Sequence, residues 1–147
     1  MQRLMVAWCC FLCTACTGPM GGDWFGELDC VVNGASQNTI LSVFLKRDAK
    51  THYEGEGAYS VDGMVVQSGL LMEFEMGGEV EVEAELTDAT GQQSVAIAFE
   101  SENCEWSLLG VFAGTDCGFD LESNAWEWDG GDVLSFADDE CVGELTR

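Results

Sequence analysis

The chain has 147 residues, of which 27 are acidic and only 5 are Lys or Arg, so its formal net charge is −22 at pH 7. Nucleic-acid binding draws on clustered Lys and Arg, so this composition excludes nucleic acid as a partner. The length suffices for one domain with a hydrophobic core but not for two. The acidity itself favours a solvated shell that keeps the protein soluble over a cation-binding function.

The first residues combine one early cation, Arg3, with an apolar run from Leu4 to Cys13 and small residues before Cys16. A charged start, a short apolar stretch and small residues before a cut are the parts of an export signal. The run is too short to span a hydrocarbon core of ~30 Å as a helix. The segment Leu12-Cys13-Thr14-Ala15-Cys16 resembles the signal of bacterial lipoprotein precursors, although Cys13 stands where that family usually has Leu.

The lipoprotein resemblance implies that residues 1–15 are removed and that Cys16 is acylated, with palmitate among the expected chains. Residues 16–22 are then the lipidated cysteine and a flexible tether, and residues 23–147 form the folded domain. Thr17 is not the Asp that retains some lipoproteins at the inner membrane. The resemblance therefore implies a lipid anchor in the cell envelope, at the outer membrane of a Gram-negative bacterium. The alternative is an ordinary secretory signal without lipid.

From Trp24 onward, short alternating runs separated by turn residues predict antiparallel strands. We expect strands at 27–32, 39–46 and 52–61, with a turn at 62–63 leading into 64–67. The clearest pattern runs from Leu70 to Leu86, where glutamates alternate with apolar residues on both sides of Gly77-Gly78. We interpret it as a hairpin closed by a two-residue Gly-Gly turn. After a turn at 88–91, a strand at 94–100 completes a three-strand meander.

The later strands are expected at 106–112, 118–121, 125–128, 133–136 and 142–146, with a turn at 129–132. Eight to ten strands without a crossover helix predict an all-β fold. In this fold class, an antiparallel meander closes into a small calycin-like barrel or forms a β-sandwich. Four cysteines lie in this domain, and an even count in an exported protein predicts two disulfides.

The domain opens with Gly22-Asp23-Trp24, which resembles the G-x-W start of the first strand in calycins, the superfamily of lipocalins, fatty-acid-binding proteins and avidins. In that family the Trp packs across the barrel floor against an Arg of the final strand, and this chain ends in Arg147. The resemblance implies that the first and last strands pair with Trp24 opposite Arg147. In that register Cys30 faces Cys141, and the resemblance leaves Cys104 to bond with Cys117.

The calycin resemblance also implies a small apolar ligand inside the barrel. Six inward-facing residues would line that ligand site: Met72, Phe74, Met76, Val82, Ile97 and Phe99. The same residues fill a solid core if the barrel is closely packed. Interior volume distinguishes the two interpretations.

The sequence offers no catalytic group. His52 is the only histidine, and its neighbours show no nucleophile signature, so we expect a solvated or structural role. The cysteines are too widely spaced for a zinc site. The acids at 129–132 and 138–140 lack the spacing of an EF-hand loop and are interpreted as solvated turns. No phosphate-binding Gly loop appears, so no metal or cofactor is expected.

Trp126 and Trp128 share one face of a strand and, with Trp106, could form an exposed aromatic surface or part of the core. The core interpretation is favoured. The sequence thus predicts a non-enzymatic, membrane-anchored binding or structural module whose partner is a small apolar ligand or an envelope protein. The alternative is a surface module for protein or carbohydrate binding, and a hydrolase is the least favoured function.

Overall fold

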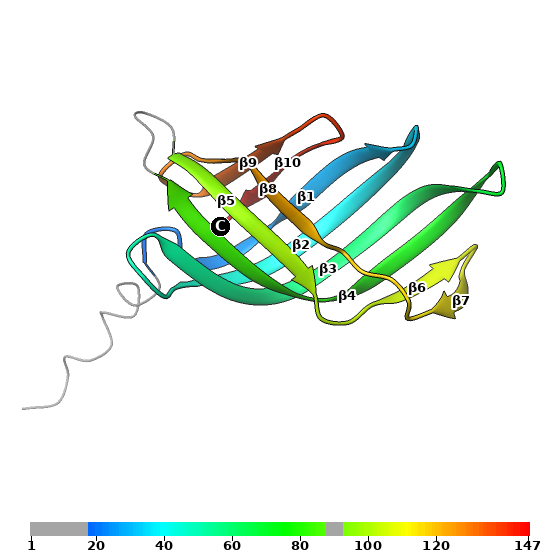
Figure 1. The fold of residues 1–147 in the computed structure, drawn as a ribbon, viewed down its shortest axis with the longest axis horizontal. Helices are drawn as coiled ribbons and strands as arrows, with labels where there is room; N and C mark the ends of the chain where they lie inside the picture. The colour runs from blue at the N-terminus through cyan, green and yellow to red at the C-terminus, as the bar shows by residue number, and fades with distance from the viewer. Residues whose placement is uncertain (1–17, 88–92) are drawn as a thin grey trace, which may run out of the picture.

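The computed structural model describes residues 18–87 and 93–147, which form ten antiparallel strands and no helix. β1 pairs with both β2 and β10, and β3 pairs with both β2 and β4, so eight strands close into a barrel (Figure 1). The β-sandwich alternative is therefore wrong. The strands are β1 (Gly22–Val32), β2 (Ala35–Arg47), β3 (His52–Gln67), β4 (Leu70–Thr87), β5 (Gln93–Ser101), β6 (Glu105–Leu108), β7 (Val111–Gly114), β8 (Leu121–Trp128), β9 (Val133–Ala137) and β10 (Cys141–Thr146).

The seam between β1 and β10 has the predicted register, running from Phe25 opposite Thr146 to Cys30 opposite Cys141. A disulfide joins Cys30 to Cys141, and a second joins the remaining two cysteines, Cys104 and Cys117, so both predicted bridges are confirmed. The strands approach each other so closely here that a Cβ on Gly26 would overlap a carbonyl oxygen of the facing strand. Glycine at this position therefore permits barrel closure.

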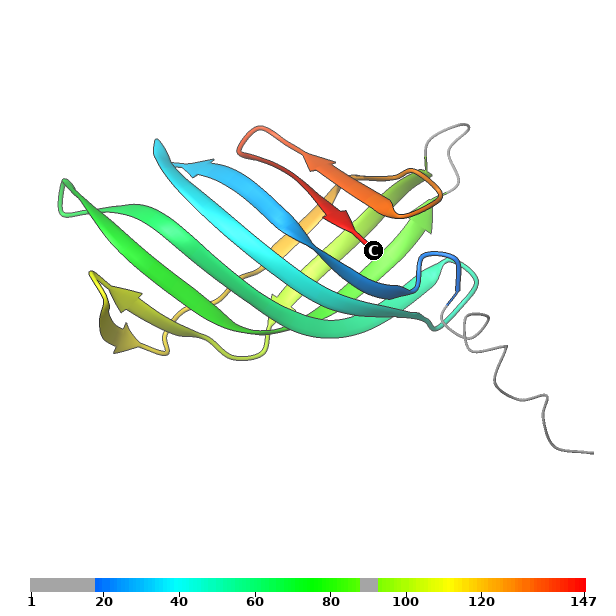
Figure 2. The same cartoon turned by 180° about the vertical axis from the view of Figure 1, so that it is seen from behind.

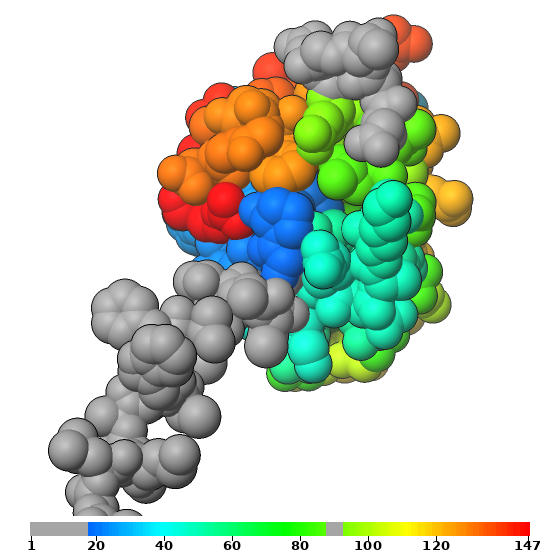
Figure 3. All heavy atoms as spheres, turned by 90° about the vertical axis from the view of Figure 1, so that its left-hand side faces the viewer, coloured from blue at the N-terminus to red at the C-terminus, as the bar shows by residue number. Residues whose placement is uncertain are grey.

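One end of the barrel is a packed floor built around Trp24, which is completely buried. Its Nε1–H donates to the carbonyl of Met20 at 2.8 Å, and Cζ of Arg147 lies 5.1 Å from the Trp24 ring centroid. Arg147 Nη1 donates to the carbonyls of Pro19 and Gly21 at 2.9 and 2.7 Å. The floor contact implied by the calycin resemblance is therefore present. Figure 3 views this end, with the first described residues (blue) beside the chain end (red).

The described part of the expected tether, residues 18–22, is packed against the floor. Met20 has no exposed surface, and β1 already begins at Gly22. The backbone N–H of Met20 also donates to the hydroxyl of Tyr53 at 3.4 Å. The described residues of the expected tether are therefore part of the fold, so the expected flexible tether is wrong for residues 18–22.

The predicted hairpin at Gly77-Gly78 is wrong, because β4 runs through both glycines as one strand of 18 residues. The alternation of inward and outward side chains continues unbroken across the two glycines, with Met76 and Val80 both facing inward. A two-residue turn at this place would put Met76 and Val80 on opposite faces of the sheet. A Cβ on Gly78 would overlap the carbonyl oxygen of Asn103. The glycine accommodates the crossing chain where the partner of β4 changes from β5 to β6.

The two-residue turns lie elsewhere, at Asn33-Gly34, Ser68-Gly69 and Leu109-Gly110, and both residues of each have positive φ. The expected turn at 62–63 is wrong because β3 is continuous there. The expected strand at 106–112 is instead the β6–β7 hairpin, and most of 118–121 lies outside the strands. Positive φ at both turn residues matches the twist of the flanking strands, as in type I′ hairpins.

These three turns lie at the open end of the barrel, opposite the floor, where the β3–β4 and β6–β7 hairpins project farthest (Figures 1 and 2). The floor end comprises residues 18–22, the turn at 48–51, the turn at 129–132 and Arg147. β4 has 18 residues, so at about 3.3 Å per residue it is about 60 Å long. The two ends are therefore well separated.

Candidate binding surface at the open end

Six exposed large apolar side chains gather on the two projecting hairpins, and we call them the tip surface: Val66, Leu70, Leu71, Leu109, Val111 and Phe112. Val111 is 70% exposed and Phe112 is 65% exposed. Leu109 is fixed against β4 through its backbone N–H, which donates to the carbonyl of Glu73 at 3.0 Å. By register, Val66, Leu71 and Phe112 lie on one face of the sheet and Leu70 and Val111 on the other. Exposed apolar groups gathered at one end of a molecule are typical of interaction sites.

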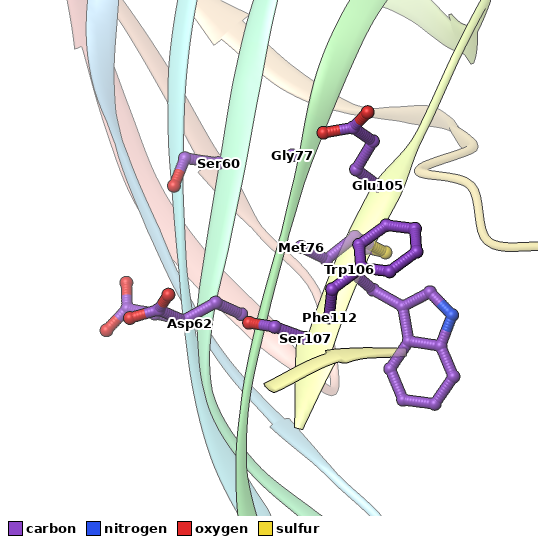
Figure 4. Close-up of a pocket in the computed structure, with 9 residues that line it drawn as sticks. Ser60, Asp62, Met76, Gly77, Glu105, Trp106, Ser107 and Phe112 are labelled. Carbon is purple, nitrogen blue, oxygen red and sulfur yellow. The ribbon is translucent and has the colours of Figure 1, made fainter. Parts of the chain in front are cut away.

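A hollow of about 580 Å³ lies beside the tip surface, where β3, β4, β6 and β7 adjoin (Figure 4). Asp62 faces Glu75 across β3 and β4, Glu75 faces Ser107 on β6, and Ser107 faces Phe112 on β7. One row of side chains therefore crosses four strands, from two carboxylates to an aromatic ring. The other lining residues are Ser60, Met76, Gly77, Glu105 and Trp106.

Charge is distributed unevenly between the two ends. Every Lys and Arg of the described residues lies at the floor end, namely Lys46, Arg47, Lys50 and Arg147. The carboxylates around the hollow and the β6–β7 hairpin thus have no cationic side chain of this chain near them. These carboxylates belong to Asp62, Glu73, Glu75, Glu105 and Asp116. Uncompensated charge of one sign produces a field that attracts cationic partners.

Carboxylates also crowd one another on the outer face of β3, β4 and β5. Glu56 faces Glu81, and Glu81 faces Glu100 on the next strand. The Glu81 carboxyl, through a hydrogen bond and its charge, raises the pKa of Glu102 above its ordinary value, and Glu79 and Glu56 add to the effect. Like charges directly opposite one another in a sheet are destabilising.

Neutralising Glu102 should stabilise the protein at neutral pH. Because folding raises its pKa, the folded state holds that proton more tightly, and stability is lost as the pH rises through the folded pKa. We expect Glu102→Gln to raise the melting temperature at pH 7 and to leave it unchanged at about pH 3.5, below the ordinary carboxyl pKa. Thermal unfolding at both pH values measures this difference.

Glu127→Gln is the matched control, since Glu127 faces serines on both neighbouring strands. It should raise the melting temperature at pH 7 by less than Glu102→Gln. An equal rise would show that net charge matters and the local cluster does not.

The six residues predicted to line an apolar ligand lie in two environments. Val82, Ile97 and Phe99 are buried in the packed core, with at most 3% of their surface exposed. Met72, Phe74 and Met76 are half-buried on the β4 segment that extends toward the open end. The assignment of the whole set to one ligand site stays a prediction.

Trp126 and Trp128 are buried, with 0% and 4% of their surface exposed, so the core interpretation is confirmed and the exposed aromatic surface is wrong for these two. The Trp126 ring centroid lies 4.8 Å from that of Phe136 and 5.9 Å from that of Phe99. Trp128 Nε1 donates to the carbonyl of Gly131 at 2.9 Å. Trp106 is half-buried, and its Nε1 donates to Asp116 at 3.0 Å.

His52 belongs to a small surface cluster near the floor. Its Nδ1 lies 3.2 Å from Oε2 of Glu85, and the Thr51 hydroxyl donates to the other carboxylate oxygen at 2.5 Å. The Thr51 hydrogen bond, with that of His52, lowers the pKa of Glu85. Among the described residues, no hydroxyl or thiol hydrogen-bonds to His52. The contacts are those of a structural histidine.

In both acidic turns an Asp side chain accepts hydrogen bonds from backbone N–H groups of the same turn. Oδ1 of Asp129 accepts from the backbone N–H groups of Gly131 and Val133 at 2.7 and 3.1 Å, and Oδ1 of Asp138 accepts from those of Glu140 and Cys141 at 2.8 and 2.6 Å. In the part of the chain that the structure describes, no group of three or more His, Cys, Asp or Glu side chains is arranged to hold a metal ion.

Cys16 lies outside the described residues, as does the turn expected at 88–91. Between residues 18 and 147, leaving out 88–92, no helix is long and apolar enough to cross a membrane. Comparisons of the chain with models of known families, with curated proteins and with solved structures find no match.

The tip surface was not predicted from the sequence, although signals for it exist. Ser68-Gly69 is a turn dipeptide, Gly110 is a residue common in turns, and each adjoins apolar residues that do not alternate with polar ones. Adjacent Leu70 and Leu71 cannot both face a core, because successive side chains of a strand point to opposite faces. One of the pair must therefore be exposed.

Proposed function

We propose that this protein is a lipid-anchored, non-enzymatic binding module of the cell envelope that contacts its partner through the open end of the barrel. The observation that carries the proposal is the gathering of the tip surface and uncompensated carboxylates at the end opposite Gly22, where β1 begins. An anchor at Cys16 would join the domain at the floor. The tip surface would then be held away from the bilayer.

The barrel acts here as a rigid spacer. Its floor half is closely packed around Trp24, Tyr53 and Phe136, all with at most 2% of their surface exposed. A partner must therefore contact exposed groups, and the best candidates are the residues of the tip surface. A partner protein fits this location better than a ligand enclosed in the floor half, because packed interiors leave few voids larger than a water molecule.

The anchor makes a direct prediction. We expect the protein from its own cells to begin at Cys16 with acyl mass on that residue, and to fractionate with membranes. Cys16→Ser should move it into the soluble exported fraction, because stable attachment depends on acyl chains buried in lipid. Mass spectrometry of the intact protein and fractionation measure both outcomes.

Cys13→Leu provides the matched control, since Cys13 would be removed with the signal and Leu is the usual residue of the lipoprotein signal at this position. It should leave the acyl mass and the membrane fraction unchanged. An unmodified amino terminus at another residue, or membrane retention of Cys16→Ser, would contradict the anchor.

A further inference from the structure

β7 is the one strand at the end of the sheet order that has a partner on a single side. It pairs with β6, and no other strand of the described chain pairs with its second edge. Every barrel strand, by contrast, has neighbours on both sides over part of its length. An unpaired edge is a template for another extended chain unless it is blunted by Pro, by charge, by a bulge, by being very short or by covering structure. β7 has only four residues and its register with β6 shifts after Phe112, so the edge it offers is the short segment at Val111 and Phe112. The four residues of β7, Val-Phe-Ala-Gly, carry neither Pro nor charge.

The register shows which backbone groups of β7 are free. The Leu109-Gly110 turn closes on Leu108 and Val111, so this pair exchanges the ladder hydrogen bonds of a two-residue hairpin. The next pair, Ser107 and Phe112, is then of the type without mutual hydrogen bonds. The N–H and C=O of Phe112 therefore point away from β6, toward the free edge. Val111 and Phe112, the two most apolar residues of this edge, are both exposed.

The surroundings of this edge specify the charge of an added strand. On the face that Phe112 shares with Ser107, the nearest rows carry Glu75, Asp62 and Glu105. Asp116 follows β7 in the chain, and every Lys and Arg of the described residues is at the opposite end. A second copy of this chain would bring a formal charge of −22 against the same carboxylates, so self-pairing is opposed by repulsion.

We propose that the open end captures an extended, basic polypeptide segment, which adds to β7 as a further antiparallel strand. Its backbone bonds to the N–H and C=O of Phe112, its apolar side chains lie on the face of the sheet that carries Val111, and its alternate Lys or Arg side chains lie on the face of Phe112, toward Glu105 and the field of the other carboxylates of the hollow. This is recognition by strand addition, in which main-chain hydrogen bonds give affinity and alternate side chains give specificity. The inference rests on the proposed function, since it names the partner of the same surface.

The test uses three synthetic octapeptides and the full protein as its cells process it. The first peptide, (Lys-Val)4, has the proposed alternation; the second is the same peptide with every amide N-methylated; the third is (Glu-Val)4. We expect the first to bind with an affinity that falls with salt, and the third not to bind. N-methylation should weaken binding by about tenfold or more, as the loss of at least one net backbone hydrogen bond requires.

Amide hydrogen exchange locates the bound peptide. The Phe112 amide should become protected when (Lys-Val)4 is present, while amides on the exposed face of β1, around Phe25, should not change. Protection spread over the whole acidic face, or equal binding of the N-methylated peptide, would overturn strand addition and leave diffuse ionic attraction. Binding to phosphatidylcholine vesicles with protection of the tip residues, in place of peptide binding, would overturn it in favour of a lipid surface.

Two substitutions distinguish the contribution of the Phe112 backbone N–H to binding from the contribution of its side chain. Phe112→Pro removes the outward N–H, and Phe112→Ala keeps it while removing the ring. The Pro variant should bind (Lys-Val)4 about tenfold more weakly than the Ala variant, and equal affinities would contradict the proposed hydrogen bond. If the Pro variant does not fold, the N-methylated peptide on the native protein decides the question. Peptide binding does not depend on Cys16, so a failed anchor with intact binding would refute the membrane location and leave the edge site standing.

Discussion

Removing the disulfide of the barrel seam should lower the free energy of unfolding by about 5 kcal/mol. Cys30 and Cys141 are 111 residues apart, so the bond restricts a loop that includes most of the folded chain in the unfolded state. The loop-closure model gives about 5 kcal/mol for a loop of that length. We expect the double variant Cys30→Ala and Cys141→Ala to unfold at a correspondingly lower denaturant concentration, measured at equilibrium by tryptophan fluorescence.

The second disulfide provides a matched control within the same chain. Cys104 and Cys117 are separated by only 13 residues, for which the same model gives about 3 kcal/mol. The double variant at these positions should therefore be the more stable of the two, with an intact barrel seam. Equal losses would mean that residual structure in the unfolded state, and not loop length, determines the effect.

Replacing Trp24 with Ala should destabilise the protein by about 3–5 kcal/mol, the usual cost of deleting a buried large aromatic side chain. Trp24 has no exposed surface, and its loss also frees the carbonyl of Met20 and removes the ring beneath Arg147. The neighbouring exposed residue supplies the control. Phe25→Ala, at a position that is 56% exposed, should change stability by no more than about 0.5 kcal/mol.

A double-mutant cycle with Arg147 tests whether the two residues act together. If the guanidinium and the ring interact, the cycle of Trp24→Ala and Arg147→Ala should give a coupling energy of about 0.5–2 kcal/mol. A coupling of zero would mean that Arg147 contributes only through its hydrogen bonds to backbone carbonyls, such as that of Gly21. Denaturant unfolding of the two single variants and the double variant measures the cycle.

The acidic surface has different consequences at the two ends of the molecule. At the floor, Asp132 is paired with Arg147 at 3.2 Å, so part of the charge is balanced. At the open end no cation of the described chain lies near the carboxylates of the hollow. A uniformly charged shell serves solubility alone, whereas this asymmetry orients an approaching cationic partner toward one end.

The features that depend on short-range pattern could be predicted from the amino-acid sequence. Period-two alternation from Trp24 onward dictated an all-strand domain, because side chains of a strand alternate between two faces. The Trp24–Arg147 register, taken from a family resemblance, correctly paired Cys30 with Cys141, since antiparallel register fixes every pair once one is known. The sequence placed Trp126 and Trp128 on one face and favoured the core interpretation, which their burial confirms.

The positions at which strands turn and change partners depend on contacts in the folded barrel. Gly77-Gly78 carries a common hairpin signal, yet β4 continues through it because the phase of alternation is preserved and the chain at Asn103 crosses there. Closure into a barrel, in place of a sandwich, depends on the pairing of strands far apart in the chain, which local patterns do not encode. For the same reason the free edge of β7 and the tip surface could not be predicted from local patterns. Whether a residue is exposed depends on which distant parts of the chain pack against it, and that is determined by the fold.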